Sequence, residues 1–204
     1  MQNFRISQPT ASVSTTTSAA LMSVQPALRV PSEEDFFTCF SYEVERAKWF
    51  KEDLDKGGWN EVHKSPGYVF WIKTFPKDEV PINILSSINL PFSAEMYMEI
   101  IDPKNQDKRD KWDKTFVEHE ILETYPDNKG VVRFMRYPTS FPLWDRSFVL
   151  YIPPPKEIDW FGKRAFIQIQ KDALHPSKLE GDDGLVRAKN GGDFVVIIPN
   201  ERYC

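Results

Sequence analysis

The sequence predicts one α+β domain in which a long helix precedes a curved antiparallel sheet. Apolar residues recur at helical spacing over residues 33–56, and the apolar pattern alternates with a period of two over most of the chain that follows. Short turns separate the successive strand candidates, which favours antiparallel over parallel pairing. A length of 204 residues with 41% hydrophobic residues suffices for one sizeable core.

Residues 1–31 have the composition of a disordered Ser/Thr-rich tail. They contain two arginines and no acid, and they are rich in Ser, Thr, Gln and Ala. A segment of this kind cannot bury enough apolar surface to order itself. The lack of acids also fits a mitochondrial presequence, but two arginines are few for one. We therefore expect the folded domain over residues 32–204.

The first helix is expected over residues 33–56. Ser32 precedes three acidic residues, 33–35, which the positive end of the helix dipole favours. Gly57 and Gly58 supply a stop. The apolar face repeats at helical spacing through Phe36, Phe40, Val44 and Ala47.

The strands begin with a hairpin. Residues 59–62 and 68–74 alternate in polarity, and the Lys-Ser-Pro-Gly sequence between them is typical of a turn. In the next strand Ile82, Ile84 and Ile88 share one face, and the three prolines at 153–155 are expected to end a later strand. The remaining elements are a strand at 81–90, a short helix at 93–101, and strands at 115–124, 131–137, 146–152, 164–171, 185–189 and 193–199.

Composition excludes several classes of function. The formal net charge is only −4, so the chain lacks the electrostatic footprint of a nucleic-acid-binding protein. It contains no run of 18 apolar residues, so any membrane contact is expected to be peripheral. Cys39 and Cys204 are the only cysteines, and no secretory signal precedes them. These features favour a reducing compartment, and we expect a cytoplasmic protein.

The histidines give no sign of a metal or catalytic centre. His63, His119 and His175 lie far apart, without the neighbouring ligands of a metal site. His119 lies between Glu118 and Glu120, but strand alternation points these glutamates away from the histidine. No Gly-x-Ser-x-Gly motif and no phosphate-binding glycine loop is present. We expect no metal and no cofactor.

One charged pair stands out in the run of residues 107–113. Arg109 and Asp113 are four residues apart and share one face if the run is helical. Taken alone, this spacing is that of an ordinary exposed helix ion pair, worth about 0.3–0.5 kcal/mol. Trp112 lies beside the pair and is best interpreted as an anchor in the core.

Three motifs together resemble a known family. They are the Arg-x-x-Trp-Asp run at 109–113, the Pro-x-x-x-Arg run that ends at Arg146 before a strand, and the Gly-Leu-Val-Arg-Ala run at 184–188. With them the chain resembles the START domains, the lipid-transfer domains related to steroidogenic acute regulatory protein, over most of residues 33–199. The group that includes phosphatidylcholine transfer protein is the most similar.

The resemblance implies a helix-grip fold and a non-enzymatic function. START domains hold one lipid in an apolar cavity, carry it between membranes and close the cavity with a long C-terminal helix. The sequence printed here stops at Cys204, so we expect that lid helix to be missing and the concave face of the sheet to be partly uncovered. A fragment, an incomplete gene model and a short isoform stay open as explanations.

The resemblance also implies the residues that contact the ligand. Arg109 and Asp113 match residues that meet the polar head group in choline-lipid carriers, and an arginine fork suits a phosphate or carboxylate. The positions of the aromatic choline cage fall on Arg133, Phe148 and Gly191, of which only Phe148 is aromatic. A register shift of one brings Phe134 to the first of these positions. The expected ligand is therefore a phospholipid or a sterol-like lipid, with an anionic or neutral head group favoured over choline.

A loop between two strands is the expected membrane contact. It contains Phe141, Leu143 and Trp144, and exposed aromatic residues beside prolines suit insertion into a membrane interface. Arg146, which follows this loop, is interpreted as structural, in an ion pair with its neighbour Asp145.

Two alternative functions stay open beside the lipid carrier. The uncovered sheet of a short chain is also suited to an interaction or regulatory module. Helix-grip relatives further include cyclases and hydrolases, and a catalytic role for Glu118, His119 or Glu120 is the third possibility.

Overall fold

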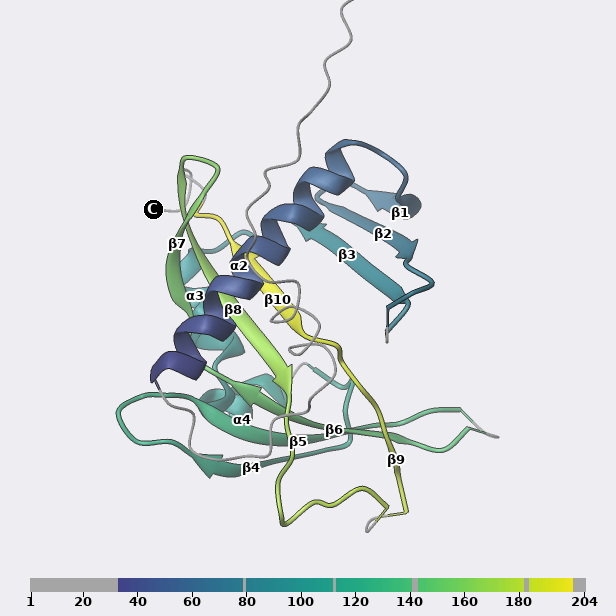
Figure 1. Ribbon diagram of the computed structural model, residues 1–204, viewed down its shortest axis with the longest axis vertical. Helices are drawn as coiled ribbons and strands as arrows, with labels where there is room; N and C mark the ends of the chain where they lie inside the picture. The colour runs from purple at the N-terminus through teal and green to yellow at the C-terminus, as the bar shows by residue number, and fades with distance from the viewer. Residues whose placement is uncertain (1–32, 79, 112, 141–142, 182–183, 200–204) are drawn as a thin grey trace, which may run out of the picture.

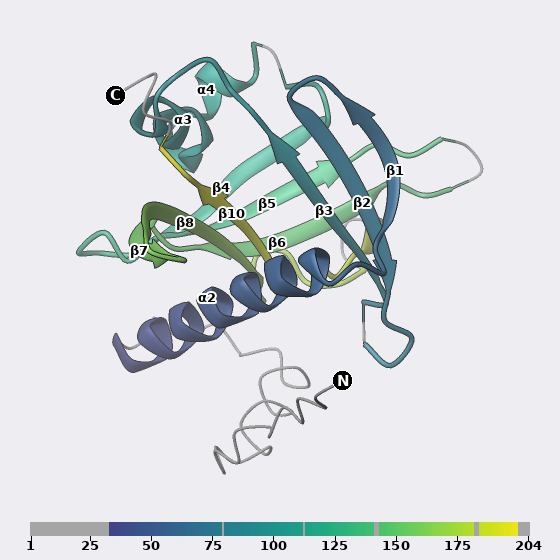
Figure 2. The same ribbon diagram turned by 90° about the horizontal axis from the view of Figure 1, so that it is seen from above.

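The long N-terminal helix is present as expected. The computed structural model describes residues 33–78, 80–111, 113–140, 143–181 and 184–199, and its first helix, α2, runs over Glu33–Asp55. The tail, the helix start at Ser32 and Trp112 lie outside the described residues. In Figures 1 and 2, α2 crosses strands β8 and β10 on one face of a sheet, whereas α3 and α4 lie on the other side.

The strands form two sheets, antiparallel except for β9, which pairs with β6 in parallel. The first is three-stranded, with the order β1-β2-β3, and the second has the central order β10-β8-β6-β5-β4. Among the described residues, β3 and β10 are each paired along one edge only. The strands are β1 (Asn60–Ser65), β2 (Tyr68–Thr74), β3 (Ile82–Ile88), β4 (Glu118–Thr124), β5 (Val131–Tyr137), β6 (Arg146–Ile152), β7 (Lys156–Trp160), β8 (Lys163–Asp172), β9 (Val186–Arg187) and β10 (Asp193–Ile197).

Three short helical segments connect the two sheets. The first, α3 (Ala94–Ile101), has Ser93 as its N-cap, because the Ser93 hydroxyl accepts a hydrogen bond from the Met96 amide. A 3₁₀ turn (Pro103–Asn105) leads into α4 (Gln106–Arg109). The helix predicted at 93–101 is thus confirmed to within one residue.

Strand β7 was not predicted. It pairs with β8 through a two-residue loop in which Phe161 and Gly162 have φ values of 53° and 78°. Positive φ at both central residues is the geometry of a tight hairpin turn that matches the twist of its strands. The three prolines at 153–155 end β6, as expected, and β7 begins directly after them.

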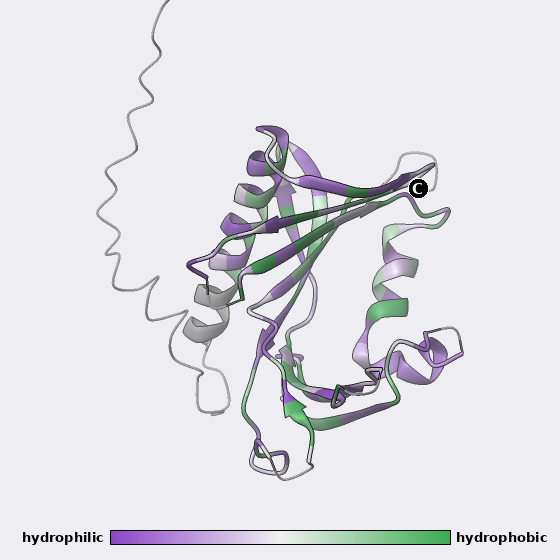
Figure 3. Ribbon diagram, turned by 90° about the vertical axis from the view of Figure 1, so that its right-hand side faces the viewer, coloured by the Kyte–Doolittle hydropathy of each residue, from purple (hydrophilic) through white to green (hydrophobic). Residues whose placement is uncertain are grey.

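The two faces of the second sheet carry different partners. The outer face, which carries α2, packs Phe40 and Ala47 of the helix against Ala165, Ile167 and Ile169 of β8. The inner face is the opposite one, and along β5 alternate residues belong to it: Val131 and Met135 pack with Leu150 and Ile152 of β6. Figure 3 shows hydrophobic and hydrophilic residues interspersed along α2 and the strands, as such alternation requires.

A buried ion cluster fixes α2 to the sheet. The Glu43 side chain is fully buried and forms ion pairs with Lys171 of β8 and with Arg46, at 3.1 Å to Arg46 Nη1. Arg46 also donates to the carbonyl oxygen of Gly192 at 3.1 Å. Gly192 has a φ of +86°, and a Cβ there would lie 2.7 Å from Arg46 Nη1, so only glycine fits this approach.

Candidate functional site

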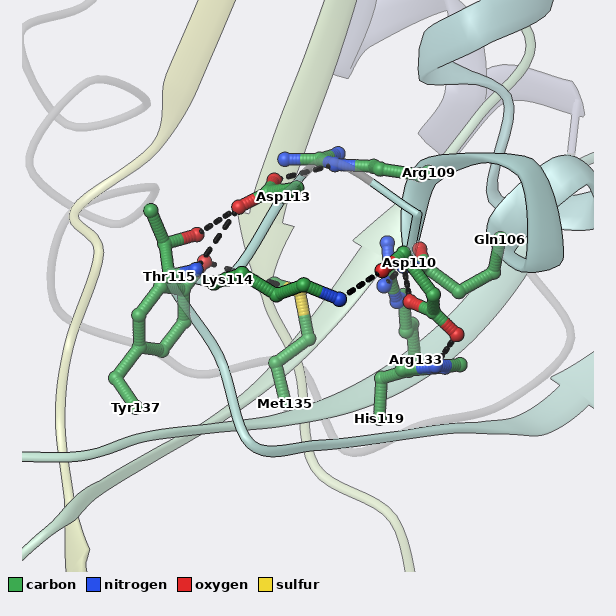
Figure 4. A network of polar contacts seen from close by, with 10 residues as sticks. All are labelled: Gln106, Arg109, Asp110, Asp113, Lys114, Thr115, His119, Arg133, Met135 and Tyr137. Carbon is green, nitrogen blue, oxygen red and sulfur yellow. Dashed lines mark hydrogen bonds and ion pairs between the residues drawn. The ribbon is translucent and has the colours of Figure 1, made fainter.

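Polar side chains gather on the inner face around one aromatic ring. We call Arg109, Asp113, Phe116, Arg133 and Tyr137 the Phe116 cluster. Phe116 is buried, and the guanidinium carbons of Arg109 and Arg133 lie 5.4 and 5.2 Å from its ring centroid. The Tyr137 ring packs against it edge to face at 6.0 Å. Figure 4 shows Arg133, Met135 and Tyr137 pointing to the same side, toward Arg109 and Asp113.

The predicted pair of Arg109 and Asp113 is in contact. Arg109 ends α4, and the Asp113 amide donates to the Arg109 carbonyl oxygen at 2.9 Å, which extends the turn by four residues. The Arg109 Nε atom lies 2.7 Å from Asp113 Oδ2. Asp113 is only 8% exposed and also accepts hydrogen bonds from the Thr115 amide and hydroxyl. The pair is therefore not the exposed surface bridge that spacing alone indicates.

The Asp113 carboxylate is held in its charged form. Burial raises its pKa, but hydrogen bonds from Thr115 and Arg109 and the charge of Arg109 outweigh burial and lower the pKa from its ordinary value. Ligand contact at this position would therefore involve an ionised carboxylate.

Arg133 is the most buried cation of the cluster. It is 2% exposed and lies in the middle of β5, where its Nη2 atom donates to the side-chain oxygen of Gln106. Its Nε atom has no hydrogen-bond partner among the described residues. Burial, and then the positive charge of Arg109, lower the pKa of Arg133 to about 10.

A chain of hydrogen bonds leads from Arg133 toward the surface. Gln106 donates to Asp110 at 2.5 Å, and Asp110 lies 3.0 Å from the His119 ring nitrogen (Figure 4). On the opposite face of β4, Glu118 and Glu120 contact Lys178 instead. The prediction that strand alternation separates these glutamates from His119 is confirmed.

Phe148 joins the cluster through an aromatic contact. It pairs directly with Met135 across β5 and β6, and its ring centroid lies 5.4 Å from that of Tyr137. The four residues predicted to bind lipid thus occupy the inner face together. Of the other two candidate cage positions, Phe134 is buried on the outer face, and Gly191 has no side chain, with Val80 only 2.9 Å from where a Cβ would lie.

Sequence reasoning missed Phe116, Tyr137 and Gln106. Tyr137 was within reach, because it follows Arg133 by four residues in a predicted strand and so shares its face. Phe116 and Gln106 carried no such signal, because the packing of α4 over β5 decides their place.

The predicted membrane contact lies in the loop between β5 and β6. Leu143 is 60% exposed and Trp144 is 70% exposed, whereas Phe141 lies outside the described residues. The base of the loop is fixed by Asp145, which pairs with Arg136 at 2.8 Å and accepts from the Thr139 amide at 3.0 Å.

The prediction of an ion pair between Asp145 and Arg146 was wrong. Arg146 donates instead to the carbonyl oxygen of Trp144, and Asp145 forms its ion pair with Arg136. Arg136 is closer to Asp145 because the register of β5 and β6 brings the ends of both strands together.

The first sheet carries an exposed apolar face. Lys73 of β2 lies 2.6 Å from Asp53 of α2, so its neighbour Ile72 and the directly paired Ile84 point away from the helix. Ile82, Ile84 and Ile88 share this face and are more than half exposed. The alternation predicted for these three isoleucines is confirmed.

Among the described residues, no cluster of three or more His, Cys, Asp or Glu side chains has a metal-binding arrangement. Within the same part of the chain, no helix is long and apolar enough to cross a membrane.

Comparison with known proteins finds similarity at the level of structure only. No family model matches the sequence. No curated protein matches it either. Solved structures do resemble the chain, and three of them align with most of its length at 14–18% sequence identity.

Human STARD10 superimposes with a TM-score of 0.60 and 18% identity, covering 87% of this chain and 65% of its own chain. Human StAR-related lipid transfer protein 5 gives a TM-score of 0.60 at 16% identity, with 79% and 76% coverage. A STAR-related lipid transfer protein from Xanthomonas axonopodis gives a TM-score of 0.55 at 14% identity, with 71% and 76% coverage. The chain therefore has the α+β helix-grip fold of StAR-related lipid transfer domains.

Proposed function

We propose that this chain is a lipid carrier that holds one lipid against the inner face and moves it between membranes in the cytoplasm. The observation that carries the proposal is the Phe116 cluster. A paired carboxylate, two arginines and a tyrosine are set into a face otherwise built from Met135, Leu150 and other apolar residues. Two of the structural neighbours support the same function, since their names describe lipid transfer proteins.

The acyl part of the ligand requires apolar surface. A lipid that leaves a bilayer exposes its chains at a cost of about 0.8 kcal/mol per methylene, so a carrier must offer an equally dry surface. The exposed isoleucine face of β3 supplies such surface, and the buried apolar residues on the inner face of β5 and β6 lie on the same side, away from α2. In Figure 2, α2 lies below both sheets, which leaves these faces on a common side.

The polar head group requires partners within this apolar surface. A buried polar group without a hydrogen bond costs several kcal/mol, so a carrier places donors and acceptors where the head group comes to rest. Arg109 and Arg133 offer donors, and Asp113 offers an ionised acceptor. Phe148 and Tyr137 line the face beside them. This role requires binding and no catalysis.

The membrane end of the carrier is proposed at the loop that bears Leu143 and Trp144. Both side chains are exposed, while Asp145 and Arg136 fix the loop base to the sheet. A tryptophan ring favours the interface between head groups and acyl chains. Contact of this kind is transient and needs no spanning segment.

A vesicle assay tests the proposal. Purified protein is mixed with donor vesicles that contain a fluorescent phospholipid and with unlabelled acceptor vesicles, and the rate of transfer is measured. We expect Ile84→Glu to reduce the transfer rate at least tenfold, because it places a charge on the isoleucine face that is proposed to contact the acyl chains. Leu179→Glu is the matched control, since Leu179 is equally exposed but lies next to Lys178, which packs on the outer face. Equal rates for the wild type and Ile84→Glu would refute the proposal.

The exposed isoleucine face also favours a second candidate, an interaction module that carries no lipid. Contiguous exposed apolar residues mark contact surfaces in proteins of many kinds. This candidate predicts that the folded chain retains no lipid and that Ile84→Glu converts an oligomer into a monomer. Sedimentation of both forms at one protein concentration distinguishes it from the carrier.

A further inference from the structure

Arg133 is a buried cation, and its Nε–H donor has no hydrogen-bond acceptor among the described residues. A guanidinium has five N–H groups in a planar fork. Arg133 is 2% exposed, and its Nη2 atom donates to Gln106, but its Nε atom has no partner among the described residues. A buried donor of this kind costs stability unless something else comes to accept from it.

The carboxylates near Arg133 form hydrogen bonds with other residues. Asp113 accepts from Arg109 and from Thr115, and Asp110 accepts from Gln106 and contacts His119. No ion pair within 4.0 Å joins Arg133 to an acid in the described part of the chain. The described residues therefore supply no direct counter-charge to this arginine.

A second cation shares the same ring. Arg109 and Arg133 both lie within 5.5 Å of the Phe116 centroid, so any ligand group placed there meets two guanidinium groups. Two like charges would oppose a quaternary ammonium, and the ring face that such a group needs is already covered. An oxyanion, in contrast, would gain charge-assisted hydrogen bonds.

The residues at the candidate choline-cage positions do not supply the aromatic faces that a quaternary ammonium needs. Phe134 faces the outer side, where its ring is covered by Lys178 at 4.2 Å, and Gly191 has no ring and lies against Val80. Phe148 alone contributes an aromatic face next to Tyr137. One or two rings beside two arginines do not form a cage for choline.

We propose that the Phe116 cluster selects lipids with an acidic head group, a carboxylate or a phosphate monoester, and that Arg133 Nε donates to that group. This inference rests on the proposed function, because it names the ligand class of the same site. The lowered pKa of Arg133 agrees with it, since burial and the positive charge of Arg109 outweigh the opposing charges of Asp110 and Asp113.

Binding of four lipids to the full chain tests the inference: oleic acid, phosphatidic acid, phosphatidylcholine and cholesterol, each measured by native mass spectrometry after incubation with loaded vesicles. We expect at least one of the two acidic lipids to bind tenfold more tightly than phosphatidylcholine. Preference between oleic acid and phosphatidic acid then tells whether the anion is a carboxylate or a phosphate.

Variants separate a binding role from a structural one. Arg133→Met should abolish the preference for acidic lipids without lowering the melting temperature, because a well-packed apolar side chain replaces a buried cation with an unused donor. Arg133→Lys keeps the charge but loses the fork, so its preference should be intermediate. Arg136→Met is the matched control: it removes one cation from β5, but Arg136 pairs with Asp145 at the strand end and its loss should leave the preference unchanged.

The outcomes are distinct. Equal or tighter binding of phosphatidylcholine or cholesterol by the wild type, or an unchanged preference in Arg133→Met, overturns the acidic head group while the carrier function stands. A lower melting temperature in Arg133→Met combined with an unchanged preference assigns Arg133 a purely structural role. Absence of binding for all four lipids overturns the proposed function, and the inference with it.

Discussion

Replacing Phe116 is expected to destabilise the domain through two separable effects. Its ring is 7% exposed and touches two guanidinium groups, the His119 ring at 5.6 Å and the Tyr137 ring at 6.0 Å. Phe116→Ala removes both the buried volume and the ring, which costs about 3–5 kcal/mol for a core phenylalanine. Phe116→Leu keeps most of the volume and removes only the ring.

The cost of Phe116→Leu follows from the contacts it loses. Two cation–π contacts, at 5.4 and 5.2 Å, contribute about 0.5–1 kcal/mol each, and the edge-to-face contact with Tyr137 adds about 0.5–1.5 kcal/mol. Their sum is about 1.5–3.5 kcal/mol. With a urea dependence of about 2 kcal/mol per molar, the unfolding midpoint should fall by about 1–2 M.

Equilibrium urea unfolding of the wild type and both variants measures these effects. Combining Phe116→Leu with Arg133→Met tests the contact directly, since the double variant should lose less than the sum of the single losses. A midpoint for Phe116→Leu equal to that of the wild type would refute the reasoning. Equal losses for the alanine and leucine variants would also refute it, because the ring would then account for the whole effect.

Three further outcomes are expected. Glu43→Gln leaves the cations Lys171 and Arg46 without their buried partner and should cost about 3–5 kcal/mol in urea unfolding; a loss below about 1 kcal/mol would show that α2 does not depend on this cluster. Burial raises the pKa of Asp113, but hydrogen bonds from Thr115 and Arg109 and the charge of Arg109 lower it overall from the ordinary 3.8. The Asp113 carboxylate therefore stabilises the fold fully above pH 3.8, and this stabilisation is lost as the pH falls through the lower folded-state pKa. In Asp113→Asn the free energy of unfolding should therefore depend less on pH below about pH 4 than in the wild type, and an unchanged pH dependence would contradict this. Trp144→Ala should slow lipid transfer several-fold at an unchanged melting temperature, and an unchanged transfer rate would remove the loop from the mechanism.

Much of the fold was predictable because its elements are locally consistent. The helix of residues 33–55 has both its periodicity and its glycine stop in the sequence, and the bounds of β5 and β6 coincide with those predicted. Strand β7 escaped prediction because its turn holds Phe161 at positive φ, where Asn or Gly is usual. Strand β9 is shorter than predicted, since only two of its residues pair with β6.

The candidate site was predictable in part. The spacing of Arg109 and Asp113 and the alternation of β5 identified residues that lie on one face. Phe116 and Gln106 depend on how α4 packs over the sheet, a tertiary relation that no local pattern encodes. The partner of Asp145 was mistaken for the same reason, because strand register rather than sequence distance selects Arg136.

Native mass spectrometry of the purified full chain, followed by extraction and identification of bound lipid, tests the central claim most directly. The account predicts one lipid per chain, retained in the wild type and lost in Ile84→Glu. A folded chain that carries no lipid after exposure to vesicles, and that assembles into oligomers, would contradict the carrier function and favour an interaction module.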